Sequence, residues 1–116
     1  MKVIKTRDED TLILEMEDSL ESDYAVRMDG RVDGILEGGI KNIIFDMSKS
    51  TYIDSTGLRI LVKALKRLNK DKGKVVLVDV GEHILHTLDI LGMAGFFTIK
   101  DTMEEALGEL NTSLKE

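Results

Sequence analysis

The chain has 116 residues, which is a usual size for one domain and is long enough to bury an ordinary hydrophobic core. Apolar residues make up 42% and charged residues 33%, a balance typical of a globular protein and not of a disordered or membrane-spanning one. The 22 acidic residues outnumber the 16 basic ones, which disfavours a general attraction to nucleic acid or to an anionic membrane. The absence of cysteine excludes disulfides, thiolate nucleophiles and thiolate metal sites.

The organisation of the chain indicates one domain over residues 1–116, because no linker, repeat or low-complexity tract interrupts it. The first residues lack the apolar core of a secretion signal, so we expect a cytoplasmic protein. The chain opens with a predicted β-hairpin, in which the apolar segments Val3–Ile4 and Leu12–Met16 flank a polar turn at Arg7–Asp10.

A helix is predicted from Leu20 to Gly39, where apolar residues recur at helical spacing. Gly30, Gly34 and Gly38 recur every fourth residue and would share one face of this helix. Interior glycines cost about 1 kcal/mol each relative to alanine. We expect this face to pack tightly on the sheet, or the helix to fray toward Gly39, with close approach to another backbone or to a partner as the alternative.

Two β-rich apolar runs, Asn42–Met47 and Lys74–Asp79, predict central strands that are covered on both faces. Between them, an apolar stripe at helical spacing predicts an amphipathic helix that ends at Lys72-Gly73. The stripe consists of Leu58, Leu61, Val62, Leu65 and Leu68. A strand, a helix and a second strand in this order predict a right-handed βαβ unit.

The last third of the chain predicts a helix at Ile84–Leu91 that is closed by Gly92, and then a short strand at Phe96–Ile99. Thr102 and Glu105 form a capping box for a fourth helix, whose apolar stripe continues to Leu114. The whole order predicts an α/β fold with a mostly parallel central sheet, an antiparallel N-terminal edge strand and about four helices.

The segment Ser50–Leu58 joins a predicted central strand to the amphipathic helix, at the edge where parallel sheets meet ligands and partners. Asp54, Ser55 and Thr56 are each good N-cap residues, and Gly57 would leave room for another molecule's backbone. The segment is either simply a well-capped helix start or a site where a hydroxyl is modified. A phosphate on Ser55 would lie at the positive end of the helix and would add a charge of about −1.5 to −2.

The sequence Asp54-Ser55-Thr56-Gly57-Leu58 resembles the signature loop of STAS domains, specifically of bacterial anti-sigma factor antagonists. The flanking segments Asn42–Asp46, Gly73–Leu77 and Ile84–Phe96 extend the resemblance over nearly the whole chain. The resemblance implies a STAS-like domain in which Ser55 is the phosphorylation site. It also implies a partner-binding surface that consists of Asp23, Asp54, Ser55, Thr56, Gly57 and Leu58. Asp18 is the alternative to Asp23 in this surface.

The same resemblance implies a partner-switching regulator that is not an enzyme and holds no cofactor or metal. The unphosphorylated form would bind an anti-sigma factor that is also a serine kinase, and would thereby free the sigma factor. The kinase would use its own ATP and magnesium to phosphorylate Ser55, and a PP2C-type phosphatase would reset it. A STAS scaffold or ligand-binding module without a phosphorylation switch is the alternative.

Three other features carry weaker hypotheses. His83 and His86 stand three residues apart and could hold a divalent metal, but a solvated helix face is the favoured interpretation. Serine hydrolysis is disfavoured because the loop lacks a Gly-x-Ser-x-Gly elbow. The basic run Lys63–Lys74 favours a solvated face, with docking of an acidic partner as the alternative.

Overall fold

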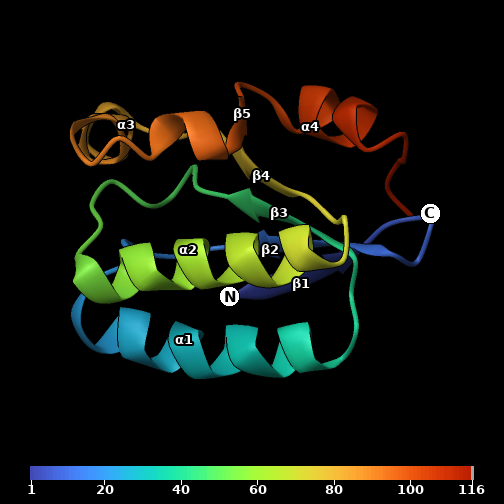
Figure 1. The fold of residues 1–116 in the computed structure, drawn as a ribbon, viewed down its shortest axis with the longest axis horizontal. Helices are drawn as coiled ribbons and strands as arrows, with labels where there is room; N and C mark the ends of the chain where they lie inside the picture. The colour runs from blue at the N-terminus through green and yellow to red at the C-terminus, as the bar shows by residue number, and fades with distance from the viewer. Residues whose placement is uncertain (116) are drawn as a thin grey trace.

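A five-stranded sheet forms the centre of the computed structural model, which describes residues 1–115 (Figure 1). The elements, in chain order, are β1 (Lys2–Lys5), β2 (Thr11–Glu15), α1 (Ser22–Glu37), β3 (Asn42–Asp46), α2 (Ser55–Lys70), β4 (Val75–Val78), α3 (Glu82–Ile90), the 3₁₀ turn η1 (Ala94–Phe96), β5 (Thr98–Lys100) and α4 (Met103–Glu109). No helix among residues 1–115 is long and apolar enough to cross a membrane.

The strands lie in their sequence order, β1-β2-β3-β4-β5, with β1 antiparallel to β2 and every later pair parallel. The predicted α/β fold with an antiparallel N-terminal edge strand is therefore confirmed. Because each crossover moves one strand further in the same direction, right-handed connections place all three crossover helices on one face. In Figure 1, α1 and α2 run side by side on that face, and α4 lies on the opposite side of the sheet.

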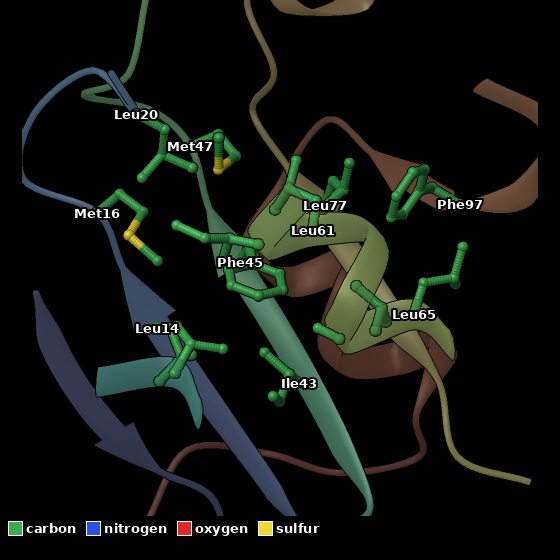
Figure 2. Packing of buried hydrophobic residues seen from close by; sticks show 14 of the residues in the cluster. Leu14, Met16, Leu20, Ile43, Phe45, Met47, Leu61, Leu65, Leu77 and Phe97 are labelled. Atoms are coloured by element: carbon green, nitrogen blue, oxygen red, sulfur yellow. The ribbon is translucent and has the colours of Figure 1, made fainter. Parts of the chain in front are cut away.

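The main core lies between the sheet and the three crossover helices. Phe45 of β3 is fully buried at its centre, with Leu14 of β2 and Leu61 of α2 among its neighbours in the cluster (Figure 2). A smaller cluster fills the opposite face, where Val76 and Val78 of β4 meet Ala106 of α4. All four residues of β4 are buried, which confirms the prediction of a central strand covered on both faces.

The glycine face of α1 does not pack on the sheet, so that expectation is wrong, whereas the alternative of a helix that gives way toward Gly39 agrees with its end at Glu37. Gly30 and Gly34 are exposed, and a Cβ atom built on either would meet nothing within 4 Å. The opposite face carries the buried residues of the helix, which are Ala25, Met28, Val32 and Leu36. The helix ends at Glu37, and Gly39 follows with a positive φ of 83°, a conformation that glycine adopts without strain.

Two predicted boundaries near the C-terminus are also wrong. The last strand starts only at Thr98, because Phe96 belongs to the turn η1 and is 67% exposed. The last helix ends at Glu109, and Asn111 reverses the chain in the left-handed region with a φ of 54°. Leu114 then forms a β-bridge to Thr6 instead of continuing the helical stripe.

Candidate functional site

Two neighbouring loops, residues 16–21 after β2 and residues 47–54 after β3, lie against each other at one edge of the sheet. We call them the paired loops. The backbone N–H of Leu20 donates to the carbonyl of Tyr52, and the N–H of Asp54 donates to the carbonyl of Leu20, both at 3.1 Å. These bonds extend the parallel pairing of the two strands beyond the sheet, so the loops hold each other in place.

Two serine hydroxyls strengthen the contact between the paired loops. The Ser50 Oγ is buried and donates to the carbonyl of Asp18 at 2.7 Å. The Ser19 Oγ accepts from the backbone N–H groups of Thr51 and Tyr52, each at 3.1 Å. Both serines act as loop-forming residues, and the sequence did not single out Ser19, because its partners lie more than 30 residues away.

Asp54 joins the starts of two helices. Its Oδ1 accepts from the N–H of Gly57 at 3.0 Å, which makes Asp54 the N-cap of α2. Its Oδ2 accepts from the N–H of Ser22, the first residue of α1, at 2.8 Å. These N–H donors, Gly57 first and then Ser22, hold the pKa of the Asp54 carboxyl below its usual value, so the group stays ionised.

Gly57 is required by this chain's own backbone. A Cβ atom at this position would lie 2.2 Å from the carbonyl oxygen of Leu20 and 2.9 Å from the Ile53 side chain. Gly57 is buried, so the space that a partner's backbone was expected to use is already filled by Leu20. That expectation is corrected: Gly57 shapes the site and offers little surface to another molecule.

Ser55 is the first residue of α2 and is exposed. No hydrogen bond joins its hydroxyl to any other residue of the described range 1–115. Thr56 and Leu58 beside it are half-buried, and Leu58 also packs against the main core. The hydroxyl of Ser55 is therefore free to react while the residues around it are fixed.

The two candidate aspartates lie in different elements, Asp23 in α1 and Asp18 in the loop after β2. Asp23 is exposed in the first turn of α1, next to Ser22, whose N–H binds Asp54. Asp18 is exposed within the paired loops and its carboxylate accepts from the N–H of Ser19. The fold thus brings Asp23 and Asp54 to adjacent helix starts, both at the left-hand end of the helix pair in Figure 1.

A shallow, open groove runs from Ser55 along the exposed side of α2. Its lining includes five cations, which we call the basic stripe: Arg59, Lys63, Lys66, Arg67 and Lys70. Two of them pair with α1: Arg59 contacts Asp29 at 3.0 Å, and Lys63 contacts Asp29 and Asp33. Within residues 1–115, the last three cations of the stripe make no ion pair.

Burial of the ammonium lowers the pKa of Lys63, but its bonds to Asp29 and Asp33 outweigh that effect and raise the pKa overall. Hydrogen bonds from Lys63, and then from Arg59, lower the pKa of Asp29 against the opposing effect of burial. The sequence could not reveal this network, because acids and cations lie on different helices.

Two aromatic features remain, one at the paired loops and one along α2. Tyr52 of the paired loops stacks on His83 of α3 with ring centroids 4.0 Å apart. His83 therefore does not lie on the solvated face that was expected for it. Along α2, Met93 and the exposed Phe96 border an apolar hollow of about 280 Å³ against Val62, a feature that the sequence analysis missed.

The fold and the site define an α/β domain with an exposed, unbonded serine at the start of a helix and a basic groove leading away from it. The chain belongs to the STAS domain family, whose model matches residues 2–106. The resemblance drawn from the sequence is therefore confirmed at the level of the family.

Among its relatives, the anti-sigma-B factor antagonist of Listeria monocytogenes is 26% identical, over 90% of this chain and 92% of that protein. A Thermotoga maritima crystal structure described as an anti-sigma factor antagonist shares 26% identity, with a TM-score of 0.83 over 93% of this chain and 94% of that one. The antagonist SpoIIAA shares the fold at 14% identity. Its unphosphorylated form gives a TM-score of 0.80 over 95% of each chain, and the phosphorylated form of the Bacillus protein gives 0.70 over 92% of this chain and 98% of that one.

Proposed function

We propose that the protein is an anti-sigma factor antagonist that works as a phosphorylation-controlled partner switch. The observation that carries this proposal is the exposed hydroxyl of Ser55, which is presented at the start of α2 by a turn held from both sides. The names of the relatives support the class of partner. The unmodified form binds an anti-sigma factor that is also a serine kinase, and this binding frees the sigma factor.

The chain is the substrate in this cycle and is not an enzyme. The Ser55 Oγ attacks the γ-phosphorus of the kinase's ATP, the bond to the ADP oxygen breaks, and the hydroxyl proton passes to a base on the kinase. The kinase supplies the ATP and magnesium. A PP2C-type phosphatase later hydrolyses the phosphate ester and restores the hydroxyl, so the cycle runs in the cytoplasm without a cofactor on this chain.

The phosphate changes the surface without unfolding the scaffold. It adds a charge of about −1.5 to −2 at a helix N-terminus, where free N–H groups and the helix dipole favour an anion. The cap at Asp54 and the close contact of Gly57 with Leu20 do not involve the Ser55 hydroxyl, so both persist. SpoIIAA, which shares this fold, has been solved with and without phosphate.

Binding is lost because a dianion replaces a neutral hydroxyl in the contact. The proposed partner surface consists of Asp23, Asp54, Ser55, Thr56 and Leu58, and it continues along the basic stripe. Asp54 already places one negative charge beside Ser55. A partner surface fitted to the neutral hydroxyl has no group that matches the added negative charge, and a charge left without a partner across an interface typically costs about 2–5 kcal/mol.

The test is capture from a lysate of the source organism with immobilised wild type, Ser55→Ala and Ser55→Asp, followed by identification of the bound proteins. We expect wild type and Ser55→Ala to retain a protein with a histidine-kinase-like ATPase fold, and Ser55→Asp to lose it. That protein, with magnesium and ATP, should then phosphorylate wild type within the tryptic peptide of residues 50–59 and leave Ser55→Ala unmodified.

Three results would overturn this proposal. Equal capture of the kinase by Ser55→Ala and Ser55→Asp would contradict the charge switch. A phosphate on Thr51 or Thr56 that persists in Ser55→Ala would assign the switch to another hydroxyl. Absence of any phosphorylation, together with stable assembly into larger complexes, would favour the STAS scaffold instead.

A further inference from the structure

Ser55 and Arg59 lie one helical turn apart on the exposed side of α2. Both line the same groove, and both are exposed to solvent. Residues four apart on a helix have Cβ atoms about 5–6 Å from each other, and an acid placed N-terminal to a base at this spacing is the favourable order. A phosphate on Ser55 would therefore lie within reach of the Arg59 guanidinium.

In the unmodified protein Arg59 pairs with Asp29, and Asp29 does not need Arg59 to keep its charge paired. The Arg59 Nη2 lies 3.0 Å from the Asp29 Oδ2, but the side chain of Arg59 is 63% exposed, and exposed pairs of this kind contribute little stability. Asp29 has a second cation, Lys63, whose hydrogen bond is the largest cause of its lowered pKa. Asp29 thus keeps a charged partner if Arg59 turns away.

We propose that Arg59 is the internal partner of the phosphate on Ser55: on phosphorylation its guanidinium leaves Asp29 and pairs with the phosphate oxygens, while Lys63 stays on Asp29. This inference rests on the proposed modification of Ser55. A phosphate carries about −1.5 to −2 charge and three acceptor oxygens, whereas Asp29 carries one charge and already has Lys63. The planar guanidinium can bind two of those oxygens at once.

The other cations of the basic stripe are placed less well for this role. Lys63 is held by Asp29 and Asp33 on the α1 side. Lys66 lies 11 residues beyond Ser55, which is about 16 Å along a helix axis, and Lys70 lies further still. Such distances exceed the screening length of about 8 Å at physiological salt. Arg59 is the cation of the stripe that shares its turn with Ser55.

This pairing would change what a partner meets at the start of the groove. In the unmodified protein the groove opens with a neutral hydroxyl and a cation. In the phosphorylated protein the cation is engaged by the phosphate, so the same end becomes anionic and loses a donor for the partner. The phosphate itself would be held against α2 in one position and would not swing freely in solvent.

The test uses protein in which phosphoserine is placed at position 55 by genetic encoding, so no kinase is needed. ³¹P NMR titration gives the second pKa of that phosphate in wild type, in Arg59→Gln and in the matched control Arg67→Gln. A nearby guanidinium favours the dianion. We therefore expect Arg59→Gln to raise this pKa by about 0.3 of a pH unit and Arg67→Gln to leave it unchanged, because an i, i+4 pair of this strength corresponds to that shift.

A second readout follows Arg59 directly. The Nε–H resonance of Arg59 should shift on phosphorylation, and the Lys63–Asp29 contact should persist, as judged from the titration of the Asp29 carboxyl. Equal phosphate pKa values in wild type and Arg59→Gln, in folded protein, would overturn the proposal. Failure of a kinase to modify Ser55 would instead count against the proposed function, and leaves this measurement unaffected.

Discussion

Gly57 and Gly34 both lie inside helices, yet the same substitution should have opposite effects at the two positions. In Gly57→Ala the new Cβ would lie 2.2 Å from the carbonyl oxygen of Leu20, whose backbone is held by the paired loops. This overlap outweighs the helical gain of about 1 kcal/mol and should destabilise the protein by about 1–3 kcal/mol. Gly34→Ala meets nothing within 4 Å and should stabilise it by about 0.5–1 kcal/mol. Urea unfolding measures both, and a stabilised Gly57→Ala would contradict the close contact.

Asp54 should make the stability of the protein depend on pH. The pKa of its carboxyl is lower in the folded protein than the usual 3.8 of an aspartate. Stability from this group is therefore complete above pH 3.8 and is lost as the pH falls through the lower, folded pKa. Asn caps a helix about as well as Asp but carries no charge.

Asp54→Asn should keep the cap of α2 but lower the unfolding midpoint at pH 7, because its single amide oxygen cannot accept from both Gly57 and Ser22. The fall in midpoint between pH 4 and pH 2 should be smaller in this variant than in wild type. Thermal unfolding of wild type and variant in parallel measures the difference, because the other carboxylates are common to both. An identical fall in the two proteins would show that the two N–H bonds do not depress the Asp54 pKa.

The sequence offered Asp54, Ser55 and Thr56 as N-cap candidates, and Asp54 is the one that caps α2, a role that follows from local rules about helix starts. The role of Ser55 came from the family resemblance and stays a prediction. The sequence analysis expected free space for a partner at Gly57, but the carbonyl oxygen of Leu20, 37 residues earlier in the chain, already fills that space. Arg59 and Asp29 are another such pair, joined across two helices. Contacts between distant segments leave no periodic signal in a single sequence.

The paired loops position the turn that carries Ser55, and a substitution of Ser50 measures how much their contact stabilises the protein. Its buried hydroxyl donates to the Asp18 carbonyl at 2.7 Å. Ser50→Ala should cost about 1 kcal/mol, because a net hydrogen bond contributes about that much. Ser48→Ala is the matched control, since Ser48 is exposed in the same loop, and it should change stability by less than about 0.5 kcal/mol. Equal effects of the two substitutions on urea unfolding would contradict the role of Ser50.

Helices and central strands could be predicted because their apolar periodicity reflects burial. The failures lie at element ends. At Phe96 an aromatic run is typical of a strand, but the residue stays exposed in η1. Leu114 fits the helical spacing of apolar residues, but α4 has already ended at Glu109 and Asn111 has reversed the chain before it. Periodicity identifies a buried face, and it does not identify the residue at which backbone hydrogen bonding stops.

At the scale of the whole molecule, a net charge of −6 hides a local basic surface on α2. If an acidic partner docks along this surface, the double variant Lys66→Gln/Lys70→Gln should associate with it severalfold more slowly than wild type. The association rate should also depend less on salt, because charges at the rim of an interface act mainly on the association rate. Stopped-flow mixing with the captured anti-sigma factor measures this. The control pair Lys72→Gln and Lys74→Gln lies beyond the helix end and should bind like wild type. Equal slowing by both pairs would indicate general charge attraction and no specific use of the groove.

The most direct test of the whole account is isothermal titration of the captured anti-sigma factor with the unmodified protein and with protein that carries phosphoserine at position 55. Both proteins should have the same circular dichroism spectrum, because the cap at Asp54 and the contact at Gly57 do not use the serine hydroxyl. The account predicts that the phosphate weakens binding at least tenfold, a loss of about 1.4 kcal/mol or more. Equal affinities for two correctly folded proteins would contradict it.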